Sequence, residues 1–466
     1  MSAYSELYQL AWKARAGSGG RAVFEKRREL ERTQWLSPAE IQTLQLKQLS
    51  RLLVHAYAHV PFYRRRFDDA GLHPDQIQAL EDYQRLPILT KEDIRHNLAQ
   101  LVATNYQRDQ LRRNTTGGST GAPLVFYQDD SFATCSWASR MRYRKWYGFE
   151  MGDRVAFLWG MDRDIPSTDW LKRLKLSLRR ERWLNSFNVS EEKMEAFASQ
   201  LIAWQPTYLI GYASSLYLFA QFLRRARLDR IRPAAIESSA EKLWDWQREL
   251  IEDVFQCPVF NVYGSREFVG LAAECEAHAG LHILADVHYV EFLKEGRPAQ
   301  NGDWGEIIVT DLTNYAMPFI RYQTGDLGRP RSQPCICGRG FPLIQEILGR
   351  SSDVLSTSDG RYVHGEYFTH LFYGVPGVRR FQVHQKTRQD VDILIEGETE
   401  LPAETLAEFR RKILDQMGEK TVLTFKRVDA IPLTPSGKYR FTVSDVPIGF
   451  ARTSAMSVES VEAARS

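Results

Sequence analysis

The sequence predicts an α/β protein in which a large N-terminal domain is followed by a small C-terminal α/β domain. Apolar runs typical of buried strands, such as Tyr208–Tyr212 and Pro258–Tyr263, alternate with helical patterns at Met194–Trp204 and Leu216–Leu223. This alternation favours parallel-type sheets. The chain has 466 residues, which is long enough for two or three domains.

Residues 1–100 are predicted to form a helical leader. Residues 1–34 predict a short helix and then a loose turn at the glycines of positions 17–20. Ser37-Pro38-Ala39-Glu40 predicts a helix start, because serine caps, proline suits the first helical position and glutamate suits the third. We expect His59–Tyr63 to break that helix and Thr90–Asp93 to cap another.

Beyond Gly349-Arg350 the pattern changes to that of a small α/β domain. The sequence predicts three strands and one helix there, at Arg380–Val383, Asp390–Glu396, Val422–Val428 and Leu406–Leu414. The predicted domains are therefore residues 1–350 and 351–450. Residues 451–466 are polar and rich in small side chains, so we expect a disordered tail.

Composition narrows the classes of function. Lysine and arginine (61) nearly balance aspartate and glutamate (58), which argues against nucleic-acid binding. No apolar run is long enough for a transmembrane segment, and the N-terminus lacks a signal-peptide pattern. Five cysteines in a chain of this length do not make a disulfide scaffold. These features predict a cytoplasmic enzyme.

The stretch Asn114–Pro123 is the first candidate for binding chemistry. It is rich in glycine and in side chains that carry a hydroxyl group, which together can surround a phosphate chain with N–H and O–H donors. It does not end in the Gly-Lys-Ser/Thr of a Walker loop, and a flexible surface turn is an equal alternative. The residues expected to face phosphate are Thr115, Thr116, Gly117, Gly118, Ser119, Thr120 and Gly121.

Three later motifs favour the phosphate-loop interpretation. They are Tyr263-Gly264-Ser265-Arg266-Glu267, Tyr322–Asp326 and Pro435–Lys438, with Leu348-Gly349-Arg350 between the last two. The order and spacing of these motifs resemble the adenylate-forming superfamily, which includes acyl-CoA synthetases. Within it the chain resembles the phenylacetate–CoA ligase and capsule-biosynthesis adenylyltransferase-like branch. The resemblance covers most of the chain, from Trp35 to Val446.

The resemblance implies ATP-dependent activation of a small carboxylic acid through an acyl-adenylate, followed by transfer to CoA. It therefore implies ATP and Mg²⁺ as cofactors, with CoA where CoA is the acceptor. Two alternatives stay open. The adenylate could pass to a sugar amine, a sugar hydroxyl or a carrier thiol in polysaccharide or secondary-metabolite biosynthesis, or the chain could be a non-catalytic adenylate-binding protein. The sequence does not predict an oligomeric state.

The resemblance also assigns roles to residues. Lys438, on a mobile C-terminal domain, would contact the α-phosphate and the carboxylate, Glu267 would ligate Mg²⁺, and Asp326 would bind the ribose hydroxyls. Without the motifs each would be an ordinary surface or turn residue. The remaining assignments are Thr115 at the phosphates, Tyr263, Gly264 and Ser265 near adenine, Arg350 at ribose and phosphate, Asp353 as the hinge, and Ser238–Glu241 as an adenine loop.

Cys275, His282, Cys335 and Cys337 form a candidate structural zinc site. Three thiolates and one imidazole make a closed tetrahedral set, and members of the resembled branch carry a similar arrangement. His278 competes as the fourth ligand, and the alternative is a group of unrelated reduced side chains. The other two cysteines, Cys135 and Cys257, are predicted to be ordinary buried residues.

Two further features have open interpretations. Leu171–Arg182 could be a membrane-surface helix, a lid over an anionic substrate, or the solvated basic face of an ordinary helix. Four aromatic residues could line a pocket for an aromatic acid or could equally belong to the core. They are Trp137, Tyr143, Tyr212 and Phe268.

Overall fold

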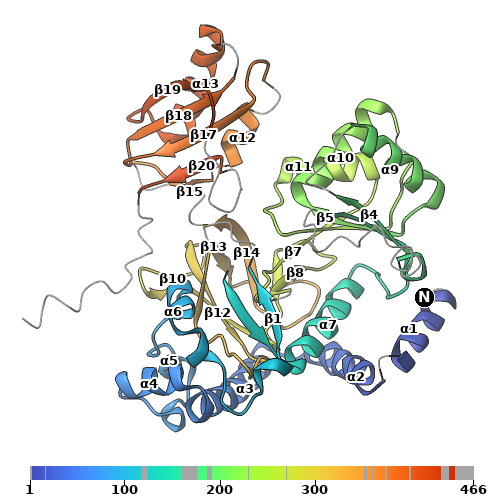
Figure 1. Ribbon diagram of the computed structural model, residues 1–466, viewed down its shortest axis with the longest axis vertical. Helices are drawn as coiled ribbons and strands as arrows, with labels where there is room; N and C mark the ends of the chain where they lie inside the picture. Colours follow the sequence, from blue (N-terminus) through green and yellow to red (C-terminus); the bar gives the residue numbers. More distant parts are fainter. Residues whose placement is uncertain are drawn as a thin grey trace, which may run out of the picture.

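The structure is a computed structural model with a central mixed sheet, which confirms the predicted α/β class (Figure 1). Its described ranges are 3–15, 17–116, 124–159, 176–185, 191–228, 230–268, 270–350, 354–358, 362–364, 366–372, 375–397, 400–431 and 440–446. Within them, none of the helices combines the length and apolar character that crossing a bilayer requires. The predicted tail, residues 451–466, lies outside these ranges.

Helices make up the N-terminal region, as expected. Ser37 caps α3: its Oγ accepts a hydrogen bond from the backbone N–H of Glu40, and the Glu40 carboxylate accepts one from the backbone N–H of Ser37. The helices are α1 (Ala3–Arg15), α2 (Gly17–Thr33), α3 (Pro38–His59), α4 (Pro61–Asp69), α5 (Leu80–Tyr83) and α6 (Lys91–Leu101), with 3-10 turns at Pro74–Gln76 and Arg108–Gln110.

The predicted loose turn at residues 17–20 is wrong. Helix α2 begins at Gly17 and continues through these glycines. One face of α2, with Val23, Phe24 and Leu30, is buried in a core shared with Met141 of α7 (Asp130–Lys145). Burial of this face outweighs the helix-breaking tendency of glycine, because tertiary packing supplies most helix stability in proteins.

The parallel half of the large sheet carries the edge at which the predicted motifs lie. Helices α9 (Glu191–Trp204), α10 (Ala213–Ala226) and α11 (Asp245–Phe255) pack on one of its faces, and α7 contacts the other. Ligands of such sheets bind at the carboxyl ends of the strands. The strands, in spatial order, are β7 (Val259–Tyr263), β6 (Ala235–Ser239), β5 (Tyr208–Tyr212), β3 (Val155–Trp159) and β4 (Glu181–Asn185).

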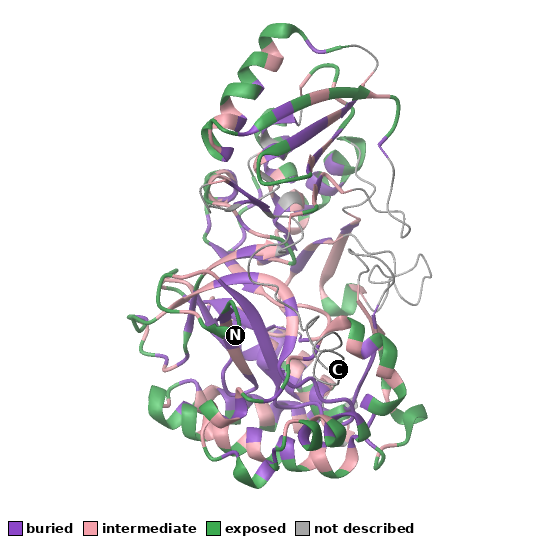
Figure 2. Cartoon of the chain, turned by 90° about the vertical axis from the view of Figure 1, so that its left-hand side faces the viewer, coloured by how far each residue is buried: buried purple, intermediate pink, exposed green. Residues whose placement is uncertain are grey.

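The other half of the sheet is antiparallel, which the predicted parallel-type sheet did not anticipate. The change of direction occurs where β7 pairs antiparallel with β8. Figure 2 shows that buried residues follow the central strands, whereas exposed residues gather on the outer helices. The antiparallel strands are β8 (Ala272–Glu274), β9 (Leu281–Ile283), β10 (His288–Lys294), β11 (Arg297–Pro298), β12 (Gly305–Asp311), β13 (Tyr322–Arg331) and β14 (Leu343–Arg350).

The C-terminal region forms a separate small unit with its own apolar core, coloured orange to red in Figure 1. All four elements predicted there are present. They are β17 (Arg380–Gln385), β18 (Asp390–Glu396), α13 (Ala403–Met417) and β19 (Val422–Val428), joined by β20 (Thr442–Ser444), the β15–β16 pair (Val354–Ser356 and Tyr362–His364) and α12 (Glu366–Phe372).

Candidate active site and metal centre

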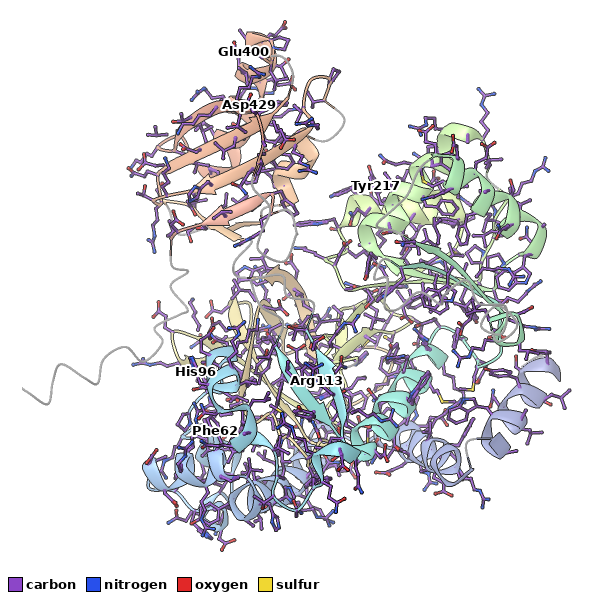
Figure 3. All side chains as sticks on the ribbon, in the orientation of Figure 1. Phe62, His96, Arg113, Tyr217, Glu400 and Asp429 are labelled. Carbon is purple, nitrogen blue, oxygen red and sulfur yellow. The ribbon has the colours of Figure 1, made fainter. Side chains whose placement is uncertain are left out.

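The predicted phosphate loop connects the two strands of a hairpin. Strands β1 (Arg112–Thr115) and β2 (Val125–Gln128) pair antiparallel, and Arg113, labelled in Figure 3, marks β1. Thr116 closes the base of the loop: its N–H donates to the Leu124 carbonyl at 3.0 Å, and its Oγ1 accepts from the Leu124 N–H at 2.9 Å. Thr115 and Thr116 are thus positioned by the hairpin.

The motif that follows β7 lies beside this hairpin. The Gln128 amide of β2 donates to the Arg266 carbonyl at 3.4 Å, which joins the two segments. Ser265 Oγ accepts from the Phe268 N–H at 3.3 Å and so tightens the turn. A side chain at Gly264 would lie 2.8 Å from the backbone nitrogen of Gly270, closer than a Cβ can approach. Glycine is therefore required at this position.

Asp326 is held by a tyrosine of that motif. The Tyr263 hydroxyl donates to Asp326 Oδ2 at 2.7 Å, and the Asp326 N–H donates to Thr324 Oγ1 at 3.1 Å. Both Tyr263 and Asp326 are half-buried. Asp326 faces Arg350 across the β13–β14 pair, although the Arg350 side chain lies outside the described part of the structure. The arrangement presents a fixed, solvent-accessible carboxylate at the strand edge.

Glu267 is held in the same way by a second tyrosine. The Tyr322 hydroxyl at the start of β13 donates to Glu267 Oε1 at 3.0 Å. The Glu267 carboxylate is half-buried. The two carboxylates, Glu267 and Asp326, are therefore oriented by tyrosines from the two motifs, which the sequence predicted to form one site. Half-exposed carboxylates suit ligation of a hard cation such as Mg²⁺.

Lys91 is a site residue that the sequence analysis missed. It was considered only as part of a helix cap, at the start of α6. In the structure its Nζ donates to the Thr324 carbonyl at 3.2 Å and lies 3.5 Å from the position of a Cβ at Gly325. The helical leader thus supplies a cation beside Asp326. The sequence signal was its place next to the capping Thr90, which says nothing about its tertiary neighbour.

The segment after β6 fits the expected position of an adenine loop. Ser239 ends β6 at the same edge as Tyr263, and Ala240 has a left-handed backbone with φ +69°. Such a conformation is unusual for a residue with a Cβ and often marks functional loops. Lys242 then forms an ion pair with Glu346 at 2.9 Å, which anchors the segment to β14.

The four predicted metal ligands come together. Their ligand atoms lie within 4.8 Å of one another: Cys275 and Cys335 Sγ are 3.6 Å apart, and Cys337 Sγ and His282 Nε2 are 3.3 Å apart. Tetrahedral zinc with ordinary bond lengths sets sulfur atoms about 3.8 Å apart and sulfur and nitrogen about 3.5 Å apart. Burial lowers the pKa of His282 to about 4, so the imidazole is in its neutral, ligating form. The cluster fits zinc.

His278 does not belong to this cluster. Its Nδ1 lies 3.3 Å from a Glu274 carboxylate oxygen, and its ring packs on Phe260 with centroids 4.7 Å apart. The competition for the fourth position is therefore resolved in favour of His282. Cys135 and Cys257 are buried free thiols, as predicted.

Comparison with known proteins gives matches to a family model, to proteins related in sequence and to solved structures. Residues 355–445 match the family model of the CapK C-terminal domain. Phenylacetate-coenzyme A ligase of Pseudomonas putida is 29% identical over 339 residues, which cover 69% of this chain and 73% of the relative. Protein CapK of Staphylococcus aureus is 24% identical over 372 residues, 78% of this chain and 80% of the relative.

A solved 2-hydroxyisobutyryl-CoA ligase, in the postadenylation state in complex with 2-HIB-AMP, has a TM-score of 0.68 at 20% identity. The structural match covers 89% of this chain and 91% of the chain of the solved ligase. The chain has the adenylate-forming ligase fold. The resemblance to the branch predicted from the ordered motifs is also confirmed, since the relatives in sequence include phenylacetate–CoA ligases and CapK.

Several predicted residues of this fold lie outside the described ranges. They are Lys438, Asp353 and the loop residues Gly117, Gly118, Ser119, Thr120 and Gly121. Of the basic stretch, residues 176–179 are helical and Arg182 lies in β4, while 171–175 are not described. The roles proposed for these residues stay predictions, as do the domain boundaries.

The four aromatic residues with an open interpretation differ in burial and in their neighbours. Phe268 is a core residue, 1% exposed, and its ring lies 5.7 Å from that of Tyr322. Tyr212 is buried at the end of β5, and its ring lies 4.3 Å from that of Trp159. Tyr143 is buried on α7, whereas Trp137 on the same helix is 45% exposed.

Proposed function

We propose that this protein activates a carboxylic acid with ATP to form an acyl-adenylate and then transfers the acyl group to CoA. The pair of tyrosine-oriented carboxylates beside the phosphate hairpin carries the proposal. Asp326 is a half-buried carboxylate in β13 that could accept hydrogen bonds from the ribose hydroxyls, and Glu267 follows Arg266, which contacts the hairpin. The relatives in sequence, phenylacetate–CoA ligases, agree with CoA as the acceptor.

The first half-reaction needs the substrate carboxylate to attack the α-phosphorus of ATP while pyrophosphate leaves. The loop that begins at Thr115 would hold the β- and γ-phosphates through N–H and O–H donors, and Asp326 would fix the ribose. Mg²⁺, held by Glu267 and phosphate oxygens, would reduce the repulsion between the anionic reactants. In the second half-reaction the CoA sulfur attacks the acyl carbon and AMP leaves.

The Cys275, His282, Cys335 and Cys337 cluster supports a structural role for zinc. Four protein ligands complete a tetrahedral shell and leave no position for substrate. The cluster joins β8, β9 and the loop before β14, so it would fix the antiparallel half of the sheet behind the site.

A second acceptor class stays open because the C-terminal domain model that matches is that of CapK. A sugar amine, a sugar hydroxyl or a carrier thiol could then attack the acyl-adenylate in place of CoA. Both readings share the adenylation step. The cytoplasmic location expected from the sequence stays a prediction.

The test is pyrophosphate release from ATP and Mg²⁺ across a panel of aromatic, aliphatic and hydroxy acids, with and without CoA. We expect acid-dependent release that the Glu267→Gln variant reduces by about 100-fold, the usual cost of losing one preorganised charge in an active site. Glu249→Gln, on the outer surface of α11, serves as the control. Release that does not depend on an acid, or that survives Glu267→Gln unchanged, would contradict the proposal.

A further inference from the structure

Helix α7 carries a cluster of charged and aromatic side chains that the adenylation chemistry does not use. Arg144 and Glu237 form a bidentate pair, with Nε to Oε2 at 2.7 Å and Nη2 to Oε1 at 2.8 Å. The Tyr147 hydroxyl also donates to Glu237 Oε2. Both oxygens of the buried Glu237 carboxylate are therefore already engaged, and Arg144 is neutralised.

Arg140 lies one turn before Arg144 on the same helix. Its guanidinium lies beside the Tyr143 hydroxyl and over the Trp137 ring, 5.2 Å from the centroid. Within the described part of the chain no carboxylate forms an ion pair with it. Burial lowers the pKa of Arg140. Arg140, Arg144 and Glu237 together carry one net positive charge. The Glu181 carboxylate interacts with Arg144 but is not among the groups that act on Arg140.

The contacts of α7 show where this charge points. Tyr147 packs near Tyr208 at the start of β5, and Arg144 contacts Glu237 in the middle of β6. Helix α7 therefore runs opposite to the parallel strands, and its N-terminal end is directed toward their carboxyl ends. Arg140 lies a further turn along, about 5.4 Å. Its place on the helix is therefore displaced toward the edge at which Trp159, Tyr212 and Ser239 end their strands.

Arg140 is also adjacent to the nucleotide-binding motif. The ring of Tyr143, the tyrosine beside Arg140, lies 3.0 Å from the position of a Cβ at Gly270. Gly270 in turn packs against Gly264 of that motif. The charge therefore lies on the α7 side of the motif, whereas Asp326 is joined to the motif through Tyr263.

We propose that Arg140 binds a second anionic group of the acid substrate, so that the protein selects acids with a negative charge remote from the carboxylate it activates. This inference rests on the proposed function and specifies its substrate class. The recognised chemistry is an anion that accepts hydrogen bonds from guanidinium, either a carboxylate or a phosphate. The aromatic rings of Trp137 and Tyr143 would flank it.

The experiment compares matched acids that differ in one charge, with pyrophosphate release as the readout. The dicarboxylate pairs are succinate with butyrate and terephthalate with 4-methylbenzoate, and the phosphate pair is 3-phosphoglycerate with glycerate. We expect wild-type protein to prefer the charged member of at least one pair. Arg140→Gln should lower kcat/KM for that acid by about 10- to 100-fold, the cost of a charged hydrogen bond, and leave the neutral member within about twofold.

Two variants separate recognition from folding. Arg140→Lys keeps the charge and should recover part of the preference, while Lys145→Gln removes an exposed charge at the end of the same helix and should change nothing. A wild-type protein that prefers the neutral member of every pair, or an Arg140→Gln variant that slows both members equally, would overturn the inference while the proposed function stands. Absence of release with every acid would instead reject the proposed function, and the inference with it.

Discussion

At the scale of residues, the site depends on two tyrosines that orient two carboxylates. Tyr263 holds Asp326, and Tyr322 holds Glu267. The sequence motifs name all four residues, but they do not say that the hydroxyls contact the acids. A tyrosine with a hydrogen-bonded hydroxyl gives each carboxylate a fixed orientation, which reduces the cost of ordering it when nucleotide binds.

Tyr263→Phe should weaken nucleotide binding more than turnover. Removing the hydroxyl leaves Asp326 free to rotate, and a hydrogen bond to a charged group contributes about 1.5–3 kcal/mol. We expect KM for ATP to rise by about tenfold with kcat little changed, measured by pyrophosphate release. The control is Tyr57→Phe, which removes a hydroxyl that bonds to Asp68 on the exposed surface of the leader. Equal effects of the two substitutions would refute the role of Tyr263.

Asp311 should make stability depend on pH. Burial raises its pKa to about 7, although hydrogen bonds from Thr313 oppose the shift. The folded state then holds a proton that the unfolded state has released above about pH 4, so this group's contribution to stability is present at low pH and is lost as the pH rises through 7. Buried His288, whose pKa is lowered to about 4, acts in the opposite direction between about pH 4 and 6.5.

Asp311→Asn isolates the first of these effects. Asparagine does not ionise. The free energy of unfolding of the variant, measured by urea denaturation, should therefore increase relative to that of the wild type as the pH rises from 5 to 8. A constant difference between the two proteins over this range would show that Asp311 does not titrate in the folded state.

At the scale of elements, the cluster of Cys275, His282, Cys335 and Cys337 lies where the sheet meets the leader. Arg339, two residues after Cys337, donates to both Glu276 oxygens at 3.1 and 3.0 Å and packs on the rings of Trp35 and Trp146. The loop passes so close to the leader that a Cβ at Gly340 would lie 1.8 Å from the Leu36 carbonyl. The loop position is therefore coupled to that of the leader.

Cys335→Ser should release zinc and loosen this junction. We expect about one zinc per wild-type chain by elemental analysis, less than about half a zinc in the variant, and a lower midpoint of thermal unfolding, because metal binding adds to folding free energy. Cys257→Ser removes a buried thiol outside the cluster and should keep its zinc. A wild-type protein without zinc that is unaffected by chelators would remove the structural role.

At the scale of the whole molecule, the large sheet and the small C-terminal unit have separate cores. The resemblance places a lysine, Lys438, on the small unit and the nucleotide carboxylates on the large one. A reaction divided in this way requires the two units to approach for adenylation. The family match covers residues 355–445, a range that includes the position of Lys438, so it concerns the unit expected to supply this lysine.

Lys438→Ala should block adenylation and spare nucleotide binding. The expected result is a loss of at least about 100-fold in acid-dependent pyrophosphate release, since the variant lacks a charge at the reacting phosphate. The dissociation constant of ATP, measured by calorimetry, should change by less than about threefold. Lys420→Ala, also in the C-terminal unit, is the control. Unchanged release in Lys438→Ala would separate this protein from the mechanism of its relatives.

The sequence by itself determined the fold class, the motifs and the three cysteines of the candidate metal site. The strands at Tyr208–Tyr212 and Val422–Val428 could be predicted because the signal is a pattern of apolar residues close together in the sequence. The order of the motifs around Tyr263 and Asp326 was enough to predict the resemblance that the relatives in sequence then confirmed.

Only the tertiary structure decided the rest. Helix α2 runs through glycines because its buried face packs on α7, the antiparallel half of the sheet follows from pairing between distant strands, and His282 rather than His278 joins the cysteines. Lys91 and Arg140 gain their significance from neighbours far away in the chain. Contacts of this kind depend on which surfaces meet after folding, and a local pattern carries no information about the partner surface.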